Sequence, residues 1–90
     1  MFMEPLIINP KEILKIIQKR FKIKFNDEIL DFQYDPTTHL LGIRFFKASD
    51  VISDSVDDTC QIVLNKDEKT KKIASIEILD LIFFLSEYSK

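Results

Sequence analysis

Apolar residues in the first part of the chain recur with the spacing of an amphipathic helix. At 100° steps one arc collects Ile13, Leu14, Ile16, Ile17, Phe21 and Phe25, and the opposite arc collects Lys11, Lys15, Gln18, Lys19 and Lys22. Asn9 is a favourable N-cap, Pro10 suits the first helical position, and Glu12 can reach back to the cap. The pattern predicts a helix over residues 9–25 with a basic outer face.

From residue 31 the period of the apolar positions changes from helical spacing to two. Phe32 and Tyr34 alternate with Gln33 and Asp35, and turn-forming residues follow. Further runs of strand character cover residues 40–46, 51–58, 60–66 and 74–78. The connections are too short for the crossovers that parallel strands require. We therefore predict an antiparallel sheet over residues 31–79.

The chain closes with a short apolar segment that has helix-start chemistry. Asp80 is a suitable N-cap for a helix over residues 80–88, although residues 81–85 are apolar all round. Together the elements predict a single domain over residues 1–90 of the α+β class. Its N-terminal amphipathic helix packs on a meander of four or five antiparallel strands, and a short C-terminal helix closes the fold.

Composition narrows the class of protein. The 90 residues are 46% hydrophobic and 31% charged, which favours a folded domain over disorder. Apolar runs fall short of the roughly 20 residues that span a bilayer, and the first residues do not resemble a signal peptide, so we expect a soluble cytoplasmic protein. Gly42 is the single glycine, which excludes Gly-rich phosphate loops. Cys60 is the single cysteine, which excludes an internal disulfide, and we interpret it as a structural thiol.

Residues 34–45 are YDPTTHLLGIRF, and about thirty residues later residues 73–80 are IASIEILD. These two segments resemble the domain of unknown function 2283 family, whose members are small proteins of prokaryotes and their viruses. The first segment matches the family's opening of Tyr-Asp, a short spacer and Leu-x-Ile-Arg, and the second matches its close. Departures are His39 where an acidic residue is usual, Gly42 where Tyr is common, and Lys71 where a turn glycine is expected. The resemblance covers about residues 31–80.

The resemblance implies a β-meander of uncharacterised function with no catalytic residues to carry over. Some members of that family lie in two-gene arrangements with small toxin-like proteins. This implies an antitoxin-like role as the partner of another small protein.

A possible catalytic constellation consists of Asp35, His39 and Glu77, because a histidine between two carboxylates can serve in general acid and base catalysis. The alternative interpretation is structural: Asp35 and His39 flank a tight turn, and Glu77 occupies an outward strand position. As metal ligands, one histidine with Asp31 and Asp35 is a poor set. We favour the structural interpretation and expect no catalytic site, no metal and no cofactor, with a weak hydrolase as the third function hypothesis.

Charge is distributed unevenly along the chain. Residues 1–25 carry a net charge of +4 and residues 26–90 a net charge of −6, within a total of −2. Lysines of the predicted helix, Lys11, Lys15, Lys19 and Lys22, could contact phosphates of nucleic acid. The alternatives are a solvated face, or contact with the acidic sheet of this or another copy. No aromatic residue interleaves with these lysines, so base-specific recognition is disfavoured.

The apolar run at the C-terminus predicts an interface. A short helix on a small sheet can bury one side, so at least one of Leu81, Phe83 and Phe84 should stay exposed in a monomer. The alternative is that this run forms a final strand or a wedge in the core. We therefore expect a non-enzymatic protein–protein interaction module whose partner is a second copy, as a homodimer, or another small protein. The alternative function is a nucleic-acid-associated protein that uses the basic helix.

Overall fold

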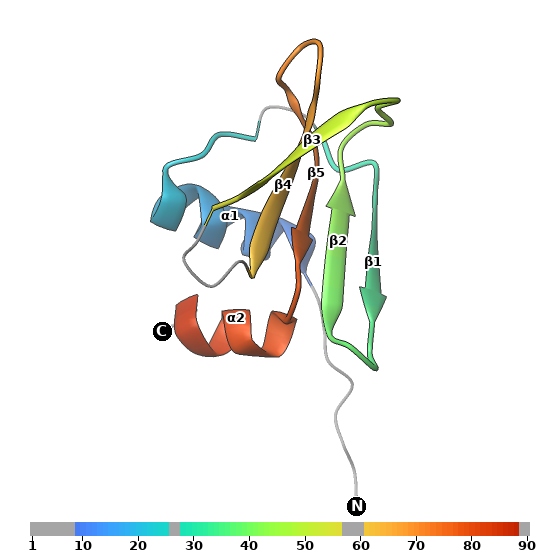
Figure 1. Cartoon of the computed structure of the whole chain (residues 1–90). Coiled ribbons are helices and arrows are strands. Elements are labelled where there is room, and N and C mark those ends of the chain that lie inside the picture. The colour runs from blue at the N-terminus through green and yellow to red at the C-terminus, as the bar shows by residue number, and fades with distance from the viewer. Residues whose placement is uncertain (1–8, 26–27, 57–60, 89–90) are drawn as a thin grey trace, which may run out of the picture.

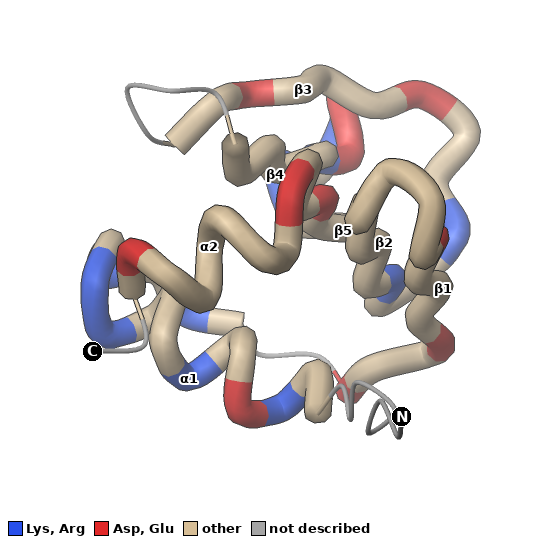
Figure 2. Tube along the Cα trace, turned by 90° about the horizontal axis from the view of Figure 1, so that it is seen from below, with Lys and Arg blue, Asp and Glu red and all other residues tan. Residues whose placement is uncertain are grey.

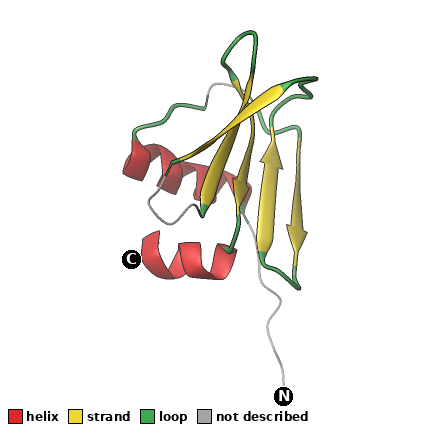
Figure 3. Cartoon of the chain, viewed as in Figure 1, coloured by secondary structure: helices red, strands yellow, loops and turns green. Residues whose placement is uncertain are grey.

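The computed structural model describes residues 9–25, 28–56 and 61–88. They form two helices and a five-stranded antiparallel sheet, and both helices lie on one face of the sheet (Figure 1; Figure 3). In chain order the elements are α1 (Pro10–Phe21), β1 (Asp31–Asp35), β2 (Leu40–Arg44), β3 (Val51–Ser55), β4 (Ile62–Asp67), β5 (Ile73–Ile78) and α2 (Leu81–Tyr88). The predicted α+β class is confirmed. Among the described residues, no helix has the length and apolar character needed to cross a membrane.

Helix α1 begins where the sequence predicts and ends earlier. The side chain of Asn9 accepts hydrogen bonds from two backbone N–H groups of the first turn, at 3.1 and 3.4 Å. Lys22 adopts a left-handed backbone conformation with φ of 56°, which ends the helix at Phe21 rather than at residue 25. The apolar pattern continues beyond the end of the helix because Phe25 also packs against the core. It reaches the core from the segment after the helix and stacks on Phe45, with ring centroids 5.4 Å apart.

The strands follow the order β1-β2-β5-β4-β3, which corrects the expected simple meander. In a meander β3 would pair with β2, whereas here β5 lies between β2 and β4 and becomes the central strand. The reason is burial. Strand β5 offers three buried apolar side chains to the core, while all five residues of β3 are exposed. A strand with so little apolar surface gains little from a central position, so β3 lies at an edge.

A single cluster of buried apolar residues joins one face of the sheet to the inner sides of both helices. Strand register places Leu41, Ile78 and Ile62 in one cross-strand row. The cluster consists of Ile13, Leu14 and Ile17 of α1, residues Leu41, Ile43, Phe45, Ile62, Leu64, Ile76 and Ile78 of the sheet and the loop after β2, and Leu81 and Phe84 of α2. These side chains all project from one face, and in the described part of the chain no helix lies on the opposite face of the sheet (Figure 3).

Helix α2 is fixed at its first turn. The carboxylate of Asp80 accepts a hydrogen bond from the backbone N–H of Phe83 at 3.1 Å, and its carbonyl accepts one from Phe84 at 2.9 Å. The backbone N–H of Leu81 donates to the carbonyl of His39 in the β1–β2 turn, at 2.8 Å. The predicted cap and helix are therefore confirmed, and the helix is tied to the hairpin beside it.

Candidate functional site

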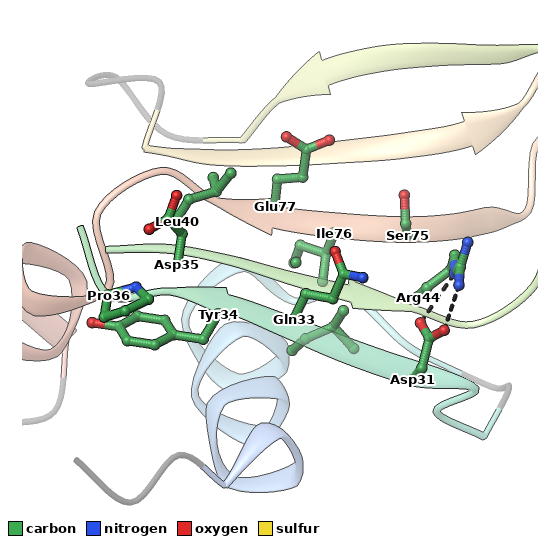
Figure 4. Close-up of a pocket in the computed structure, with 12 residues that line it drawn as sticks. Asp31, Gln33, Tyr34, Asp35, Pro36, Leu40, Arg44, Ser75, Ile76 and Glu77 are labelled. Carbon is green, nitrogen blue, oxygen red and sulfur yellow. Dashed lines mark hydrogen bonds and ion pairs between the residues drawn. The ribbon is translucent and has the colours of Figure 1, made fainter. Parts of the chain in front are cut away.

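The helix-free face of the sheet contains a shallow depression across β1, β2 and β5 (Figure 4). Its volume is about 860 Å³. In the strand register, Gly42 lies between Gln33 of β1 and Glu77 of β5. A Cβ atom placed on Gly42 would meet no atom within 4 Å, so the missing side chain leaves open space at the floor. Local sequence identified Gly42 as a strand residue but not as the floor of a depression.

One end of the depression is closed by an ion pair between neighbouring strands. The Nε atom of Arg44 donates to Oδ1 of Asp31 at 3.0 Å, and an Nη atom of Arg44 donates to the other carboxylate oxygen. The two residues are direct partners in the β1–β2 register. This two-pronged contact lowers the pKa of the Asp31 carboxyl and raises that of Arg44. Arg44 is therefore engaged within the chain rather than presented to an anion.

Next to the depression, a buried asparagine connects three strands. Asn65 is only 7% exposed, and its amide nitrogen donates to Oγ of Ser75 and to Oε1 of Glu77, both at 3.0 Å. Its amide oxygen accepts a hydrogen bond from Oγ of Ser53 at 2.6 Å. The bond from Asn65 gives the Glu77 carboxylate a fixed neighbour. Sequence reasoning missed this network, because residues 53, 65 and 75 become direct neighbours only in the particular β3–β4 and β4–β5 registers of the fold.

The structure does not assemble the constellation of Asp35, His39 and Glu77. Asp35 and Glu77 both line the depression, whereas His39 is not among its lining residues. His39 has φ of 63°, and its Nδ1 atom shares a 2.7 Å hydrogen bond with the hydroxyl of Tyr34. Asp35 accepts a hydrogen bond from the backbone N–H of Thr37 at 2.8 Å, and such turn bonds lower the pKa of its carboxyl. Each group thus has its own structural partner, as the turn interpretation describes.

Metal sites require particular arrangements of ligand side chains. Within residues 9–25, 28–56 and 61–88, no group of three or more histidine, cysteine, aspartate or glutamate side chains is arranged to hold a metal ion. Cys60, interpreted above as a structural thiol, lies outside the described residues.

The lysines proposed to contact phosphates lie on the outer side of α1 or at its end. Lys11, Lys15, Lys19 and Lys22 are all exposed. Lys15 lies 3.4 Å from the carboxylate of Glu12, and both side chains are more than half exposed, so this pair contributes little to stability. Figure 2 shows these basic positions along α1, on the side of the molecule opposite β3.

Helix α2 separates the three residues predicted to form an interface. Leu81 and Phe84 are fully buried in the core of the chain itself, so in this fold they are not available to a partner. Phe83 is 40% exposed, which meets the expectation that at least one of the three stays exposed. Beside it, Ile82 is 47% exposed and Leu79 is 40% exposed, and neither was predicted to belong to the interface. We call Leu79, Ile82 and Phe83 the α2 surface.

Comparison of the chain with protein-family models, with curated proteins and with solved structures finds no match. The resemblance to the domain of unknown function 2283 family therefore stays a prediction that rests on the two sequence segments.

Proposed function

We propose that this chain is a cytoplasmic, non-enzymatic protein–protein interaction module, and that it contacts a second copy of itself through the α2 surface. One observation carries the proposal. Within five residues, three large apolar side chains are 40% to 47% exposed, although the same segment places Leu81 and Phe84 entirely in the core. Water contact at Leu79, Ile82 and Phe83 is unfavourable, and a second apolar surface would remove it.

The exposed areas set the strength of this contact. Full burial of a large apolar side chain contributes about 1.5–3 kcal/mol, so the exposed part of each of the three contributes roughly 0.6–1.4 kcal/mol. A symmetric dimer would bury six such side chains, for a gross gain of about 4–8 kcal/mol. Association itself costs at least about 4 kcal/mol. The α2 surface alone therefore supports a weak dimer, and the range of chain concentrations in the test should extend to millimolar.

Absolute molar mass measured by light scattering tests this proposal. We expect the mass to rise from that of one 10.6 kDa chain towards twice that value as concentration increases, and to be unaffected by added salt. Phe83→Glu should hold the chain at the mass of a monomer. Phe32→Glu is the matched control, because Phe32 is similarly exposed at 44% but lies on β1. A monomer at every concentration, or equal effects of both variants, would contradict self-association through α2.

The resemblance to the domain of unknown function 2283 family supports another protein partner for the α2 surface, namely a different small protein. If the α2 surface binds a different small protein, as the antitoxin-like role implies, the chain stays monomeric alone. Mixing with the product of a neighbouring gene should then give a complex that Phe83→Glu abolishes and Phe32→Glu preserves.

The exposed lysines of α1 favour nucleic acid as a second candidate function. Lys11, Lys15 and Lys19 follow one another at intervals of four residues, which places them along one side of the helix. Binding through these three groups should weaken with salt, with a slope of log K against log salt of about −3. The double change Lys15→Glu and Lys19→Glu should abolish it. Binding that is insensitive to both changes would exclude α1 as the contact.

A further inference from the structure

Among the described residues, strand β3 lies at one edge of the sheet and pairs with a neighbouring strand on one side only. It ends the sheet next to β4, and all five of its residues are exposed. Figure 2 shows it along the border of the molecule away from α1. Natural edge strands are commonly blocked by proline, by lysine or by a covering helix, and the sequence VISDS of β3 contains neither of these residues. Its free edge can therefore accept another strand.

The hydrogen bonds to β4 show which main-chain groups of β3 face outward. The carbonyl of Asp50 accepts from the N–H of Glu68, and the N–H of Val56 donates to the carbonyl of Ile62. In an antiparallel pair, residues that bond to the partner alternate with residues that point away from it. Even-numbered positions of β3 thus face β4, and the main-chain groups of Val51 and Ser53 point to the free edge.

Side chains beside this edge have a defined chemistry. Ile52 is 40% exposed, and it projects on the same face as Asp54, two residues later. Asp54 lies 3.5 Å from Lys66, and its side chain is still 55% exposed. Asp50 is exposed at the position two residues before Ile52. The edge therefore presents an apolar residue between two carboxylates at intervals of two.

This arrangement disfavours a second copy of β3 as the occupant. If two copies of β3 paired antiparallel about Ile52, Asp50 of each copy would lie opposite Asp54 of the other. If they paired about Ser53, Asp54 of each copy would lie opposite Ile52 of the other. Like charges directly opposite each other destabilise a strand pair, and a carboxylate against an apolar side chain loses hydration. A strand with basic residues at the two flanking positions removes both problems.

The geometry points to β3 as a docking edge for an extended segment of another protein, with the pattern basic, any residue, apolar, any residue, basic. The apolar residue would lie over Ile52, and the basic residues would face Asp50 and Asp54. Main-chain hydrogen bonds to Val51 and Ser53 supply affinity, and the side chains supply selectivity, as in other cases of strand addition. This site goes beyond the α2 surface and does not depend on it.

Three synthetic peptides test the proposal on the full chain. The first has seven residues, with lysine at positions two and six, isoleucine at position four and threonine elsewhere. The second replaces both lysines with glutamate. The third keeps the lysines and carries N-methyl groups on the backbone at positions three and five, which removes hydrogen-bond donors while preserving charge. Amide hydrogen exchange and chemical shifts measured by NMR report binding at each residue.

We expect the lysine peptide to slow exchange of the Val51 and Ser53 amides by about tenfold or more at saturation. The glutamate peptide should bind about tenfold more weakly, because two exposed ion pairs are replaced by repulsion. The N-methylated peptide should give no protection. Equal binding of all three peptides, or perturbations that avoid β3, would overturn the proposal.

Variants of the chain complete the test. Val51→Pro removes an outward N–H at the first residue of an edge strand, where proline is tolerated, and should abolish binding with the melting temperature preserved. Phe83→Glu should bind the lysine peptide normally, so failure of the α2 proposal is distinguishable from failure of this one. Concentration-dependent protection of Val51 and Ser53 without any peptide would identify a second copy as the occupant and would refute the basic partner.

Discussion

Two adjacent phenylalanines of α2 provide a direct test of how this helix is oriented on the sheet. Phe84 is fully buried, contacts Tyr88 with ring centroids 5.2 Å apart and belongs to the core cluster. Phe83 is 40% exposed. Phe83→Ala and Phe84→Ala make the same chemical change at neighbouring positions of one helix. Differences in helix propensity therefore cancel, and the difference in stability reports burial.

The magnitudes follow from the two environments. Removal of a fully buried phenylalanine costs about 3–5 kcal/mol, because it loses transfer free energy and leaves a cavity. Phe83 is about 60% buried and would leave a site open to water, so its replacement should cost about 1–2 kcal/mol. A domain of this size has a total free energy of unfolding of about 5–13 kcal/mol. Phe84→Ala should therefore remove a large fraction of it, and Phe83→Ala a small one.

Urea denaturation followed by circular dichroism measures this difference, at chain concentrations low enough to keep the protein monomeric. The urea midpoint of Phe84→Ala should lie about 1–2 M below that of Phe83→Ala. Equal midpoints, or a greater loss for Phe83→Ala, would show that α2 is rotated relative to the packing described here. The α2 surface would then have to be redefined.

Three further changes probe the turn, the sheet floor and the ion pair. Lys22→Gly should raise the free energy of unfolding by about 0.5–1 kcal/mol, because glycine adopts the left-handed conformation that ends α1 without a side-chain penalty; a loss of stability by the same assay would contradict this. Gly42→Ala should raise the free energy of unfolding by about 0.5–1 kcal/mol, because the new Cβ enters open space and alanine restricts the unfolded chain more than glycine does. Thermal denaturation measures this change. Arg44→Gln should be less stable than the parent chain near neutral pH. Because Arg44 lowers the pKa of Asp31 in the folded state, this stabilisation is present above the ordinary value of 3.8 and is lost as pH falls through the lowered pKa, so the two stability curves should converge in acid.

Local patterns in the sequence were sufficient for several elements. The start of α1 followed from Asn9 and Pro10, and the start of α2 from Asp80, because a cap is formed by residues that are close neighbours in the chain. The strands followed from alternation, and their antiparallel pairing followed from short connections. These features depend on interactions within a few residues, so they can be recognised without the fold.

Strand order is the feature that the sequence left open. Alternation states that a strand has an apolar face, but several arrangements can bury the same face. The position of β5 between β2 and β4 depends on which pairing buries most apolar surface across the whole sheet. That choice leaves β3 at the edge. The registers of β4 with β3 and with β5 bring Ser53, Asn65 and Ser75 into one hydrogen-bonded network.

The sequence by itself determined which segments are helices and which are strands, where both helices begin, and that the C-terminal segment is apolar. These features depend on local hydrogen bonding and periodicity. Only the tertiary structure decided that Phe84 is in the core while Phe83 is exposed, because a run that is apolar all round carries no period to orient it. It also decided that His39 bonds to Tyr34 rather than joining Asp35 and Glu77. Each of these outcomes is set by packing between segments that are distant in the chain, and such packing is resolved only when all the elements compete for one core.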